Sequence, residues 1–481
     1  MSLAGLAPAT ALAQSPPAAP EKLTVGDWQL SPLLEIRTRG EYRRDAPDLG
    51  GFDLVGNLSS RVRDAWVVSE RSRLGLGADR GALRIQLTLQ DARALGSPTP
   101  TATLTPRRDV SLFGPYEAYA EVHGTGARPN YLKLGRQAIV WGEGRLLGNA
   151  DFSPTGRWLD AVRAHAALGN FDVEALAALL EVPSPLGTPF GETSGPQRSG
   201  VQLYGVLGRW TVDPLLVVEL YAFARIARSN GADLDGSRFA LARLSGETYT
   251  GALRVSGDSR GWTYGIEGAY QLGNANALAV GGQKVNAYAA AGHVSKTLPD
   301  VALTPTFRIA GSYASGDDGS GTYHQFDPLL PDPQRFHGQM DLFAWSNLID
   351  ASARVQIVPA TDTTFALEYR YAQLAQASGE WIGSYLNGIG RAAPSPAFIA
   401  AGYTPNTGSP SAELGHEIDA AFTWRPLVPL EVRVGWSGLF LGDGAKGIMS
   451  SQARGATQPN GTVAAPSFAQ YAYAQASVAL P

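Results

Sequence analysis

The sequence predicts an all-β fold, namely a transmembrane antiparallel β-barrel of about eighteen strands. Three observations predict it. Apolar and polar residues alternate along many short segments, short and long connections follow one another in turn, and no apolar run reaches the 18 or so residues of a membrane-spanning helix. Because lipid cannot satisfy backbone polar groups, a chain without such helices can span a membrane only as a closed barrel.

The alternation is clearest in residues 83–90, where every odd position is aliphatic and every even position is polar. Residues 365–371 alternate in the same way, with Glu368 and Arg370 on the polar side. Such a pattern places one face of a strand in an apolar phase and the other in a wet one. A soluble β-sandwich produces the same pattern, so the alternation alone does not distinguish the two folds.

We expect strands at the following positions: 30–44, 68–79, 82–92, 114–123, 130–136, 157–167, 169–180, 199–211, 214–227, 246–257, 260–272, 283–295, 302–315, 348–358, 362–375, 414–425, 428–441 and 468–479. The links after even-numbered strands are tight, for example 79–81 and 212–213. Most links after odd-numbered strands are long, for example 93–113 and 376–413. Short periplasmic turns and long extracellular loops are typical of bacterial outer-membrane barrels, and this sorting favours the barrel over the sandwich.

The beginning of the chain reads as a secretion signal. Ala11-Leu12-Ala13 fits a small-x-small cleavage site and follows an Ala- and Leu-containing stretch. We therefore expect a signal peptide at 1–13, a periplasmic lead-in at 14–29 and a single outer-membrane barrel at 30–481.

Composition excludes several classes of function. The formal net charge of −4 without a basic block argues against nucleic acid as a partner. Absence of cysteine rules out disulfides, thiolate metal sites and a cysteine nucleophile. His324, His337 and Asp341 lie near one another in the sequence, but loop histidines at such spacing are more often solvated or capping groups. We expect neither a metal nor a cofactor.

Opposite to the aliphatic face, the strands carry many charged residues, which we expect to line the lumen because charge on the lipid face is costly. The cations that we assign to the lumen by this parity include Arg37, Arg39, Arg43, Lys133, Arg225, Arg254, Arg308 and Arg433, and those that we select as pore-lining candidates are Arg71, Arg73, Arg84, Arg163, Arg354 and Arg370. Carboxylates alternate with them almost in balance. One interpretation is structural pairing of mixed charges; the other is a ladder of arginines that guides an anionic polymer.

Two groups of motifs carry a family resemblance. The first comprises YLKLGRQ at 131–137, WGEGRLLGN at 141–149, TGR at 155–157 and DAVR at 160–163; the second comprises FDPLLP at 326–331, GQMDLF at 338–343 and WSNL at 345–348. Together these motifs resemble the alginate-export family of outer-membrane barrels. The resemblance implies an eighteen-stranded monomeric barrel with an Arg-lined constriction, through which an anionic polysaccharide leaves the cell.

On the matched motifs, the resemblance makes Arg136, Arg145, Arg157 and Arg163 the constriction candidates, with Asp160 as their carboxylate partner. Arg136 shares the phase of the aliphatic Leu132 and Leu134, so it can face the pore only if the strand ends or bulges near Gly135. Arg145 lies in an expected loop and requires that loop to fold inward. Salt bridges that fix the loop are an equally good interpretation of these arginines.

The function that we expect is an outer-membrane channel for an anionic polysaccharide or a small anionic solute. Its partners would be outer-membrane lipid, that solute and, for export, proteins on the periplasmic side. One alternative is a general or substrate-specific uptake porin. A barrel hydrolase is the other, but none of the six histidines has a persuasive catalytic spacing, and we expect no catalytic residues.

Overall fold

The computed structural model describes residues 23–47, 64–97, 112–180, 201–227, 245–277, 280–384, 388–391, 411–452 and 465–480. The expected signal peptide at 1–13, and the lead-in as far as residue 22, lie outside the described residues.

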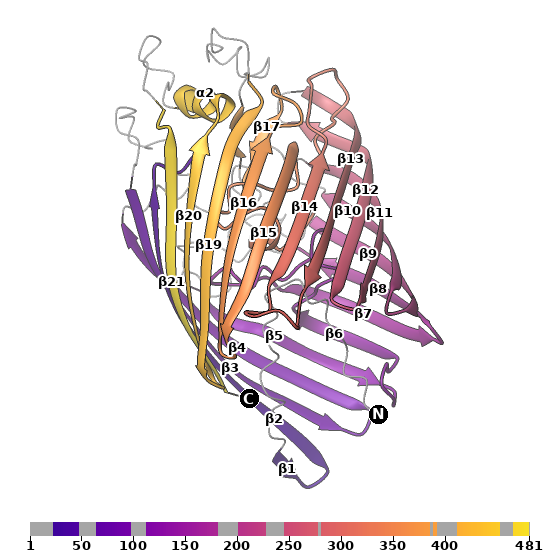
Figure 1. The fold of residues 1–481 in the computed structure, drawn as a ribbon. Coiled ribbons are helices and arrows are strands. Elements are labelled where there is room, and N and C mark those ends of the chain that lie inside the picture. Colours follow the sequence, from indigo (N-terminus) through magenta and orange to yellow (C-terminus); the bar gives the residue numbers. More distant parts are fainter. Residues whose placement is uncertain are drawn as a thin grey trace.

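Nineteen of the described strands form one antiparallel sheet that closes on itself (Figure 1). Its nineteen members include β1 (Leu23–Val25), which pairs only with the start of the next strand, so eighteen strands build the wall. The wall strands are β2 (Trp28–Arg44), β3 (Asp64–Arg80), β4 (Leu83–Ser97), β5 (Leu112–His123), β6 (Tyr131–Gln137), β7 (Leu159–Leu168), β8 (Phe171–Leu179), β9 (Val201–Asp213), β10 (Leu216–Ala227), β11 (Ser245–Ser259), β12 (Trp262–Ala277), β13 (Val280–Thr297), β14 (Thr306–Ala314), β15 (Leu348–Ala360), β16 (Thr363–Gln373), β19 (Glu413–Leu427), β20 (Leu430–Leu441) and β21 (Phe468–Leu480). The ring closes where β21 pairs with β2, from Leu34↔Leu480 to Arg44↔Gln470.

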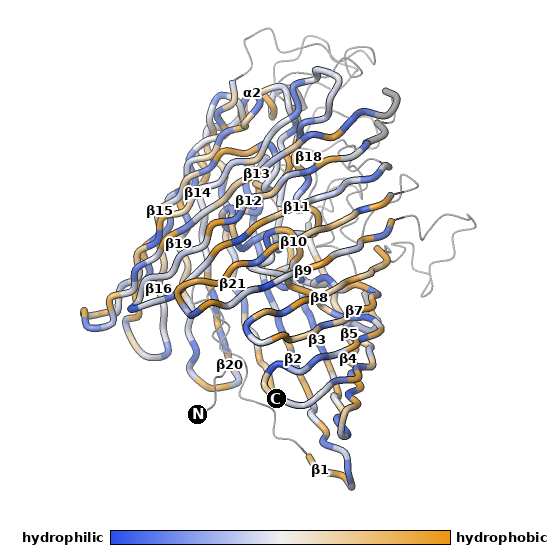
Figure 2. The backbone as a smooth tube through the Cα atoms, turned by 90° about the vertical axis from the view of Figure 1, so that its right-hand side faces the viewer, coloured by the Kyte–Doolittle hydropathy of each residue, from blue (hydrophilic) through white to orange (hydrophobic). Residues whose placement is uncertain are grey.

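All eighteen expected strands are present, and the fold class is confirmed. The alternation of lipid-facing and lumen-facing residues is also as expected. On β3, the lipid-facing Leu74 and Leu76 are 64% and 47% exposed, whereas the residues of opposite parity include the buried Arg71 and Arg73. Figure 2 shows the resulting alternation of hydrophobic and hydrophilic residues along the wall.

The tight turn between β11 and β12 matches the geometry that hairpins prefer. Between β11 and β12, Ser259 pairs with Trp262, and both turn residues, Arg260 and Gly261, have positive φ angles of 50° and 78°. Two positive φ angles define a type I′ turn, whose twist matches that of the flanking strands.

Some elements differ from the sequence-based expectation. β12 and β13 extend to Ala277 and Val280, which makes the link between them short although it follows an odd-numbered wall strand. The hairpin of β17 (Glu380–Ile382) and β18 (Gly388–Arg391), the 3-10 turn η3 (Pro333–Arg335) and helix α2 (Asp443–Gln452) were not expected. These elements lie in long loops, whose local sequence has no sustained period.

Two of the long connections fold against inward-facing wall residues. We call residues 138–158 the first lumen segment and residues 315–347 the second lumen segment. They touch directly, because Leu147 and Leu330 form a parallel β-bridge. Leu147, Leu330 and Trp345 are all about 1% exposed, so the largest apolar clusters of the structure lie inside the barrel, around these segments.

We predict that Gly415→Ala weakens the wall. Gly415 has a φ of 131°, and a Cβ there would lie 2.0 Å from the carbonyl oxygen of Phe440. The substitution should lower the free energy of unfolding by about 1–3 kcal/mol or more, measured as a lower temperature for the heat-dependent gel shift of the folded barrel. Gly251→Ala is the control, because a Cβ at Gly251 has no atom within 4 Å. Equal shifts in both variants would contradict the prediction.

Candidate functional site

Arginines of the barrel wall hold the first lumen segment in place. Arg71 donates from Nη1 to the carbonyl oxygen of Asp151 at 3.0 Å, and Arg37 donates from Nη2 to that of Ser153 at 2.8 Å. The Asp151 carboxylate also lies 3.2 Å from Nη1 of Arg73. Burial by itself would raise the pKa of Asp151, but Arg71, Arg73 and Arg37 hold it well below its usual range. The turn at 151–153 is therefore anchored to β2 and β3 by charge-assisted hydrogen bonds.

Arg157 joins the two lumen segments. Its Nη1 donates to the carbonyl oxygens of Gly148, Leu330 and Pro331, each at 2.7 Å. Next to this contact, two backbone hydrogen bonds join the segments: Gly148 N donates to Leu330 O at 2.8 Å, and Leu330 N donates to Leu146 O at 3.0 Å. The guanidinium of Arg157 thus supplies a hydrogen-bond donor to three buried carbonyl oxygens, from both lumen segments, that water would otherwise have to satisfy.

A second charged cluster lies at the tip of the first lumen segment. The Glu143 carboxylate lies 2.8 Å from Nη2 of Arg254 and 3.7 Å from Nε2 of His293, both on the wall. Burial would raise the pKa of Glu143, but His293, Arg254 and Arg145 lower it to about 2.

Arg145 is buried close to Glu143 and packs on an aromatic ring of the other segment. Its guanidinium lies 4.0 Å from the ring centre of Phe336 and 3.8 Å from the carboxylate of Glu267. Burial lowers the pKa of Arg145, partly offset by Glu267 and Glu143. The expected inward fold of this loop is thus present, and Arg145 reaches the lumen.

The second lumen segment rests on wall carboxylates. Met340 N donates to Oε1 of Glu417 at 3.1 Å, and Gln339 N donates to Oδ2 of Asp419 at 3.3 Å. His337 is buried, with Nδ1 at 3.5 Å from Oδ2 of Asp350. Burial lowers the pKa of His337.

The predicted pore arginines are distributed over several environments. Arg370 pairs with Asp350 and with Glu368, below the second lumen segment. Arg163 pairs with Glu174 at 2.7 Å, and Glu174 also accepts a hydrogen bond from the indole of Trp141. Arg71, Arg73, Arg145 and Arg157 contact the lumen segments, whereas Arg84 and Arg354 lie on the wall away from them, next to Asp79 and Glu368 respectively.

The Arg136–Asp160 pair differs from the expectation. The two residues are direct Cα partners between β6 and β7, and their carboxylate and guanidinium meet at 2.8 Å. The register shows no bulge along β6, so Arg136 keeps the parity of Leu132 and Leu134, which are more than half exposed on the outer surface. The two side chains pair, but they face outward, where β6 and β7 meet the first lumen segment, and not toward a constriction.

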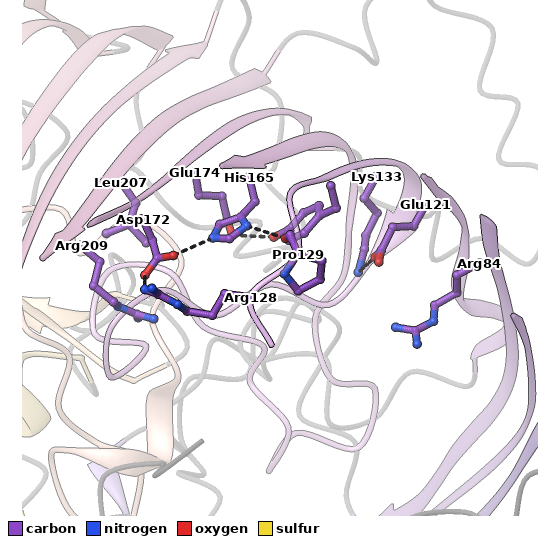
Figure 3. A pocket seen from close by; sticks show the side chains of 11 residues that line it. Arg84, Glu121, Arg128, Pro129, Lys133, His165, Asp172, Glu174, Leu207 and Arg209 are labelled. Carbon is purple, nitrogen blue, oxygen red and sulfur yellow. Dashed lines mark hydrogen bonds and ion pairs between the residues drawn. The ribbon is translucent and has the colours of Figure 1, made fainter. Parts of the chain in front are cut away.

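A recess of about 400 Å³ opens on the inner wall at the periplasmic end of β4 to β9 (Figure 3). Its lining is rich in charge: Arg84, Glu121, Arg128, Lys133, His165, Asp172, Glu174 and Arg209 line it together with Pro129, Tyr131 and Leu207. The side chains of Arg84, Arg128 and Arg209 remain 40–46% exposed, although each has a carboxylate partner. The Tyr131 and His165 rings stack at 5.1 Å.

Sequence analysis missed part of this arrangement. Arg128 lies in a periplasmic turn, and Arg209 was not assigned a role; the inward parity of β9 alone would have selected Arg209. Glu143, in the matched motif, was read only as part of the family pattern. Its partners Arg254 and His293 are more than a hundred residues away in the sequence, so no local pattern could have identified them.

In the described part of the chain, no helix is long and apolar enough to cross a membrane. Within the same residues, no group of three or more potential ligand side chains could hold a metal ion.

Comparisons with known proteins agree with this architecture. The family described as "Alginate export" matches residues 29–456. Among solved structures, OccK2 (OpdF) of Pseudomonas aeruginosa, in complex with glucuronate, has a TM-score of 0.53 at 12% identity, covering 94% of this chain and 96% of that one. OccK8 (OprE) of the same organism has a TM-score of 0.52 at 10% identity, covering 94% and 98%. Its outer membrane protein OprD has a TM-score of 0.50 at 13% identity, covering 96% of both chains. No curated protein matches the sequence.

The closed wall of amphipathic strands, with a charged interior and inward-folded loops, defines an outer-membrane channel protein of the porin-like class. Within that class, the chain belongs to the alginate-export family, and it resides in the bacterial outer membrane.

We predict that Arg157→Ala releases the two lumen segments from each other. The loss of three charge-assisted hydrogen bonds leaves buried carbonyl oxygens without that donor, at a local cost of about 1–3 kcal/mol or more. Amide hydrogen exchange at residues 144–157 and 328–332 should accelerate at pH 7, while the wall strands keep their protection. Arg84→Ala is the control on the open wall, and equal protection of the segments in both variants would contradict the prediction.

Glu143 should make the first lumen segment sensitive to acid. In the folded protein the pKa of Glu143 is about 2, below its ordinary value of 4.5. The ionised carboxylate therefore stabilises the docking of the first lumen segment on the wall above pH 4.5. This contribution is lost as the pH falls from 4.5 toward 2. A spin label on Val140→Cys, a position 41% exposed in a chain without native cysteine, should gain mobility over that range.

In Glu143→Gln, the same label should be more mobile than wild type already at pH 7. Its mobility should also change less between pH 4.5 and 2, with Asp151 supplying the remaining acid dependence. Superimposable pH profiles for the two proteins would refute the role of Glu143.

Proposed function

We propose that this channel passes an anionic saccharide, either a polysaccharide or a small sugar acid, and that arginines of the lumen wall make transient contacts with its carboxylates. The observation that carries the proposal is the periplasmic recess, where Arg84, Arg128 and Arg209 remain partly exposed to the lumen. Membership of the alginate-export family supports the same class of solute.

The chemistry of the recess suits passage better than tight binding. The planar fork of arginine matches a carboxylate with two parallel hydrogen bonds. Each of these arginines already has a carboxylate neighbour, for example Asp172 at 2.9 Å from Arg128, so a solute carboxylate would compete with an internal one. Exposed ion pairs contribute only about 0–1 kcal/mol each, which allows a solute to exchange from one contact to the next.

The stacked rings of Tyr131 and His165 provide an additional surface in the same recess. A flat aromatic face beside cations is suited to a sugar acid, because the apolar face of the sugar packs on the ring while its carboxylate meets the arginine. The fold neighbour OccK2 was crystallised with glucuronate, which is a solute of this chemical kind.

The selectivity of purified protein in planar bilayers tests the proposal. Wild type should conduct ions with a mild anion preference, and Arg84→Glu with Arg209→Glu should shift the reversal potential in a salt gradient toward cations. The control is Arg80→Glu at a periplasmic turn, where the side chain is 55% exposed and has the outward parity of β3. An unchanged reversal potential in the double variant would contradict the role of the recess.

The size of the solute is tested by block of the same current. Glucuronate and a uronate oligomer are added separately to the periplasmic side. Stronger block by the oligomer at equal carboxylate concentration favours a polysaccharide, and equal block favours a small sugar acid. If neither reduces the current while neutral sugars do, the proposal of an anionic solute fails.

A further inference from the structure

A row of five charged residues crosses the inner wall from the periplasmic recess to the first lumen segment. We call Asp172, Arg209, Glu219, Arg254 and Glu267 the charge row. They lie on β8 to β12, one on each strand, and each is the direct Cα partner of the next. Their signs alternate along the row. Opposite charges directly across from each other stabilise neighbouring strands, so each inner member of the row has a favourable partner on both sides.

The two ends of the charge row contact different parts of the lumen. At one end, Arg209 lines the periplasmic recess (Figure 3). At the other end, two residues of the first lumen segment contact the row. The Glu143 carboxylate lies 2.8 Å from Nη2 of Arg254, and Nε of Arg145 lies 3.8 Å from the carboxylate of Glu267. The charge row therefore joins the surface that we propose for the solute to the tip of a lumen segment.

Glu219 connects the two ends, because its carboxylate is divided between two arginines. Its Oε1 accepts a hydrogen bond from Nε of Arg209 at 2.8 Å, and its Oε2 accepts one from Nη1 of Arg254. The hydroxyl of Tyr221 also donates to Oε2, at 3.0 Å. The side chain of Glu219 is 1% exposed, whereas that of Arg209 is 43% exposed. A solute can thus reach Arg209 but not the carboxylate with which Arg209 pairs.

Arg254 is shared in the same way, between one carboxylate of the wall and one of the first lumen segment. Its Nη1 donates to Glu219, and its Nη2 donates to Oε1 of Glu143 at 2.8 Å. The side chain of Arg254 is 6% exposed, so water screens these contacts only weakly. One positive charge thus interacts with two buried carboxylates, and a change at one of them alters its attraction to the other.

Loss of Arg209 from Glu219 would change this balance. Removal of one partner from a buried ion pair leaves a charge that is poorly compensated, which is costly. Glu219 would therefore attract Arg254 more strongly, and the contact between Arg254 and Glu143 would weaken. A solute carboxylate that binds Arg209 competes for the same guanidinium and acts in the same direction. Because Arg209 is partly exposed, it can exchange partners at little cost.

We propose that the charge row couples the recess to the first lumen segment, so that an anionic solute paired with Arg209 loosens the docking of Glu143 on the wall. Glu219 is then a positioning residue, which acts on the segment through Arg254 and does not contact the solute. This inference rests on the proposed function, because it takes the recess as the place where the solute carboxylate binds.

A spin label on Val140→Cys tests the coupling without any solute. Arg209→Ala should raise the mobile fraction of the label several-fold at pH 7, because it removes one of the cations that neutralise Glu219. Arg209→Lys should restore most of the wild-type spectrum. Arg84→Ala is the control, because it removes the same charge from the recess, but Arg84 pairs with Asp79, outside the charge row. The heat-dependent gel shift verifies that each variant is folded. Equal spectra of wild type and Arg209→Ala would overturn the proposal.

Glucuronate is the solute probe in the same labelled proteins at pH 7. It should raise the mobility of the label in wild type and have little effect in Arg209→Ala. In Glu219→Gln, glucuronate should still block the current, because Arg209 remains available, but the label should no longer respond. A purely structural role of Glu219 would change the mobility before addition and leave the response to glucuronate intact. That result would also overturn the proposal.

Coupling between two sites is reciprocal, so a loosened segment should strengthen the binding of the solute. Glu143→Gln should therefore lower the concentration of glucuronate that blocks half of the current, by about 5-fold, which is the low end of the range for coupled sites. In the Glu219→Gln background, the same substitution should change this concentration much less. An unchanged or higher half-blocking concentration in Glu143→Gln alone contradicts the coupling.

Failure of the proposed function gives a different pattern of results. In that case, glucuronate neither blocks the current nor changes the mobility of the label in wild type, whereas Arg209→Ala still mobilises the label. Such an outcome supports the link from Arg209 to the first lumen segment and overturns the role of the solute. Block of the current without any response of the label has the opposite meaning, because the recess then binds the solute and the charge row does not transmit it.

Discussion

The satisfaction of backbone hydrogen bonds in lipid is the constraint on which the rest of this structure depends. Lipid offers no hydrogen-bonding partner, so each wall strand needs a neighbour on both sides, and the sheet must close. The pairing of β21 with β2 supplies that closure. Once the ring is closed, each strand has one face in lipid and one in the lumen, and the side-chain period of two assigns every residue to one of them. Charge consequently accumulates inside, in a space that two long loops also occupy.

The arginines inside the lumen have two separate roles. Deeply buried arginines, such as Arg71 and Arg157, bind carbonyl oxygens and carboxylates of the lumen segments and so act as structural residues. Partly exposed arginines, such as Arg84 and Arg209, lie in the periplasmic recess and can still exchange partners. The difference is one of solvent access, because a fully desolvated guanidinium cannot give up its partners without a large cost. The arginines nearest to the lumen segments are therefore less suited to contact a moving solute than those of the recess.

Lipid-facing exceptions are as informative as the lumen. Arg136 and Asp160 lie on the outer parity of β6 and β7, where the two side chains form an ion pair with each other. An outward charge can therefore be accommodated where its counter-ion is the direct cross-strand partner.

Sequence alone determined the strands of the wall, the sorting of turns and loops, and the lumen parity of residues such as Arg73 and Arg370, because a period of two and turn chemistry are local properties. The motifs around residues 131–163 and 326–348 also indicated the family from the sequence alone. Apart from the Arg136–Asp160 pair, only the tertiary structure decided what the arginines contact. Arg157 meets Leu330, and Glu143 meets Arg254, across more than a hundred residues, and these contacts depend on how the loops enter the closed barrel. The path of an aperiodic loop is set by such long-range packing, which no local pattern encodes.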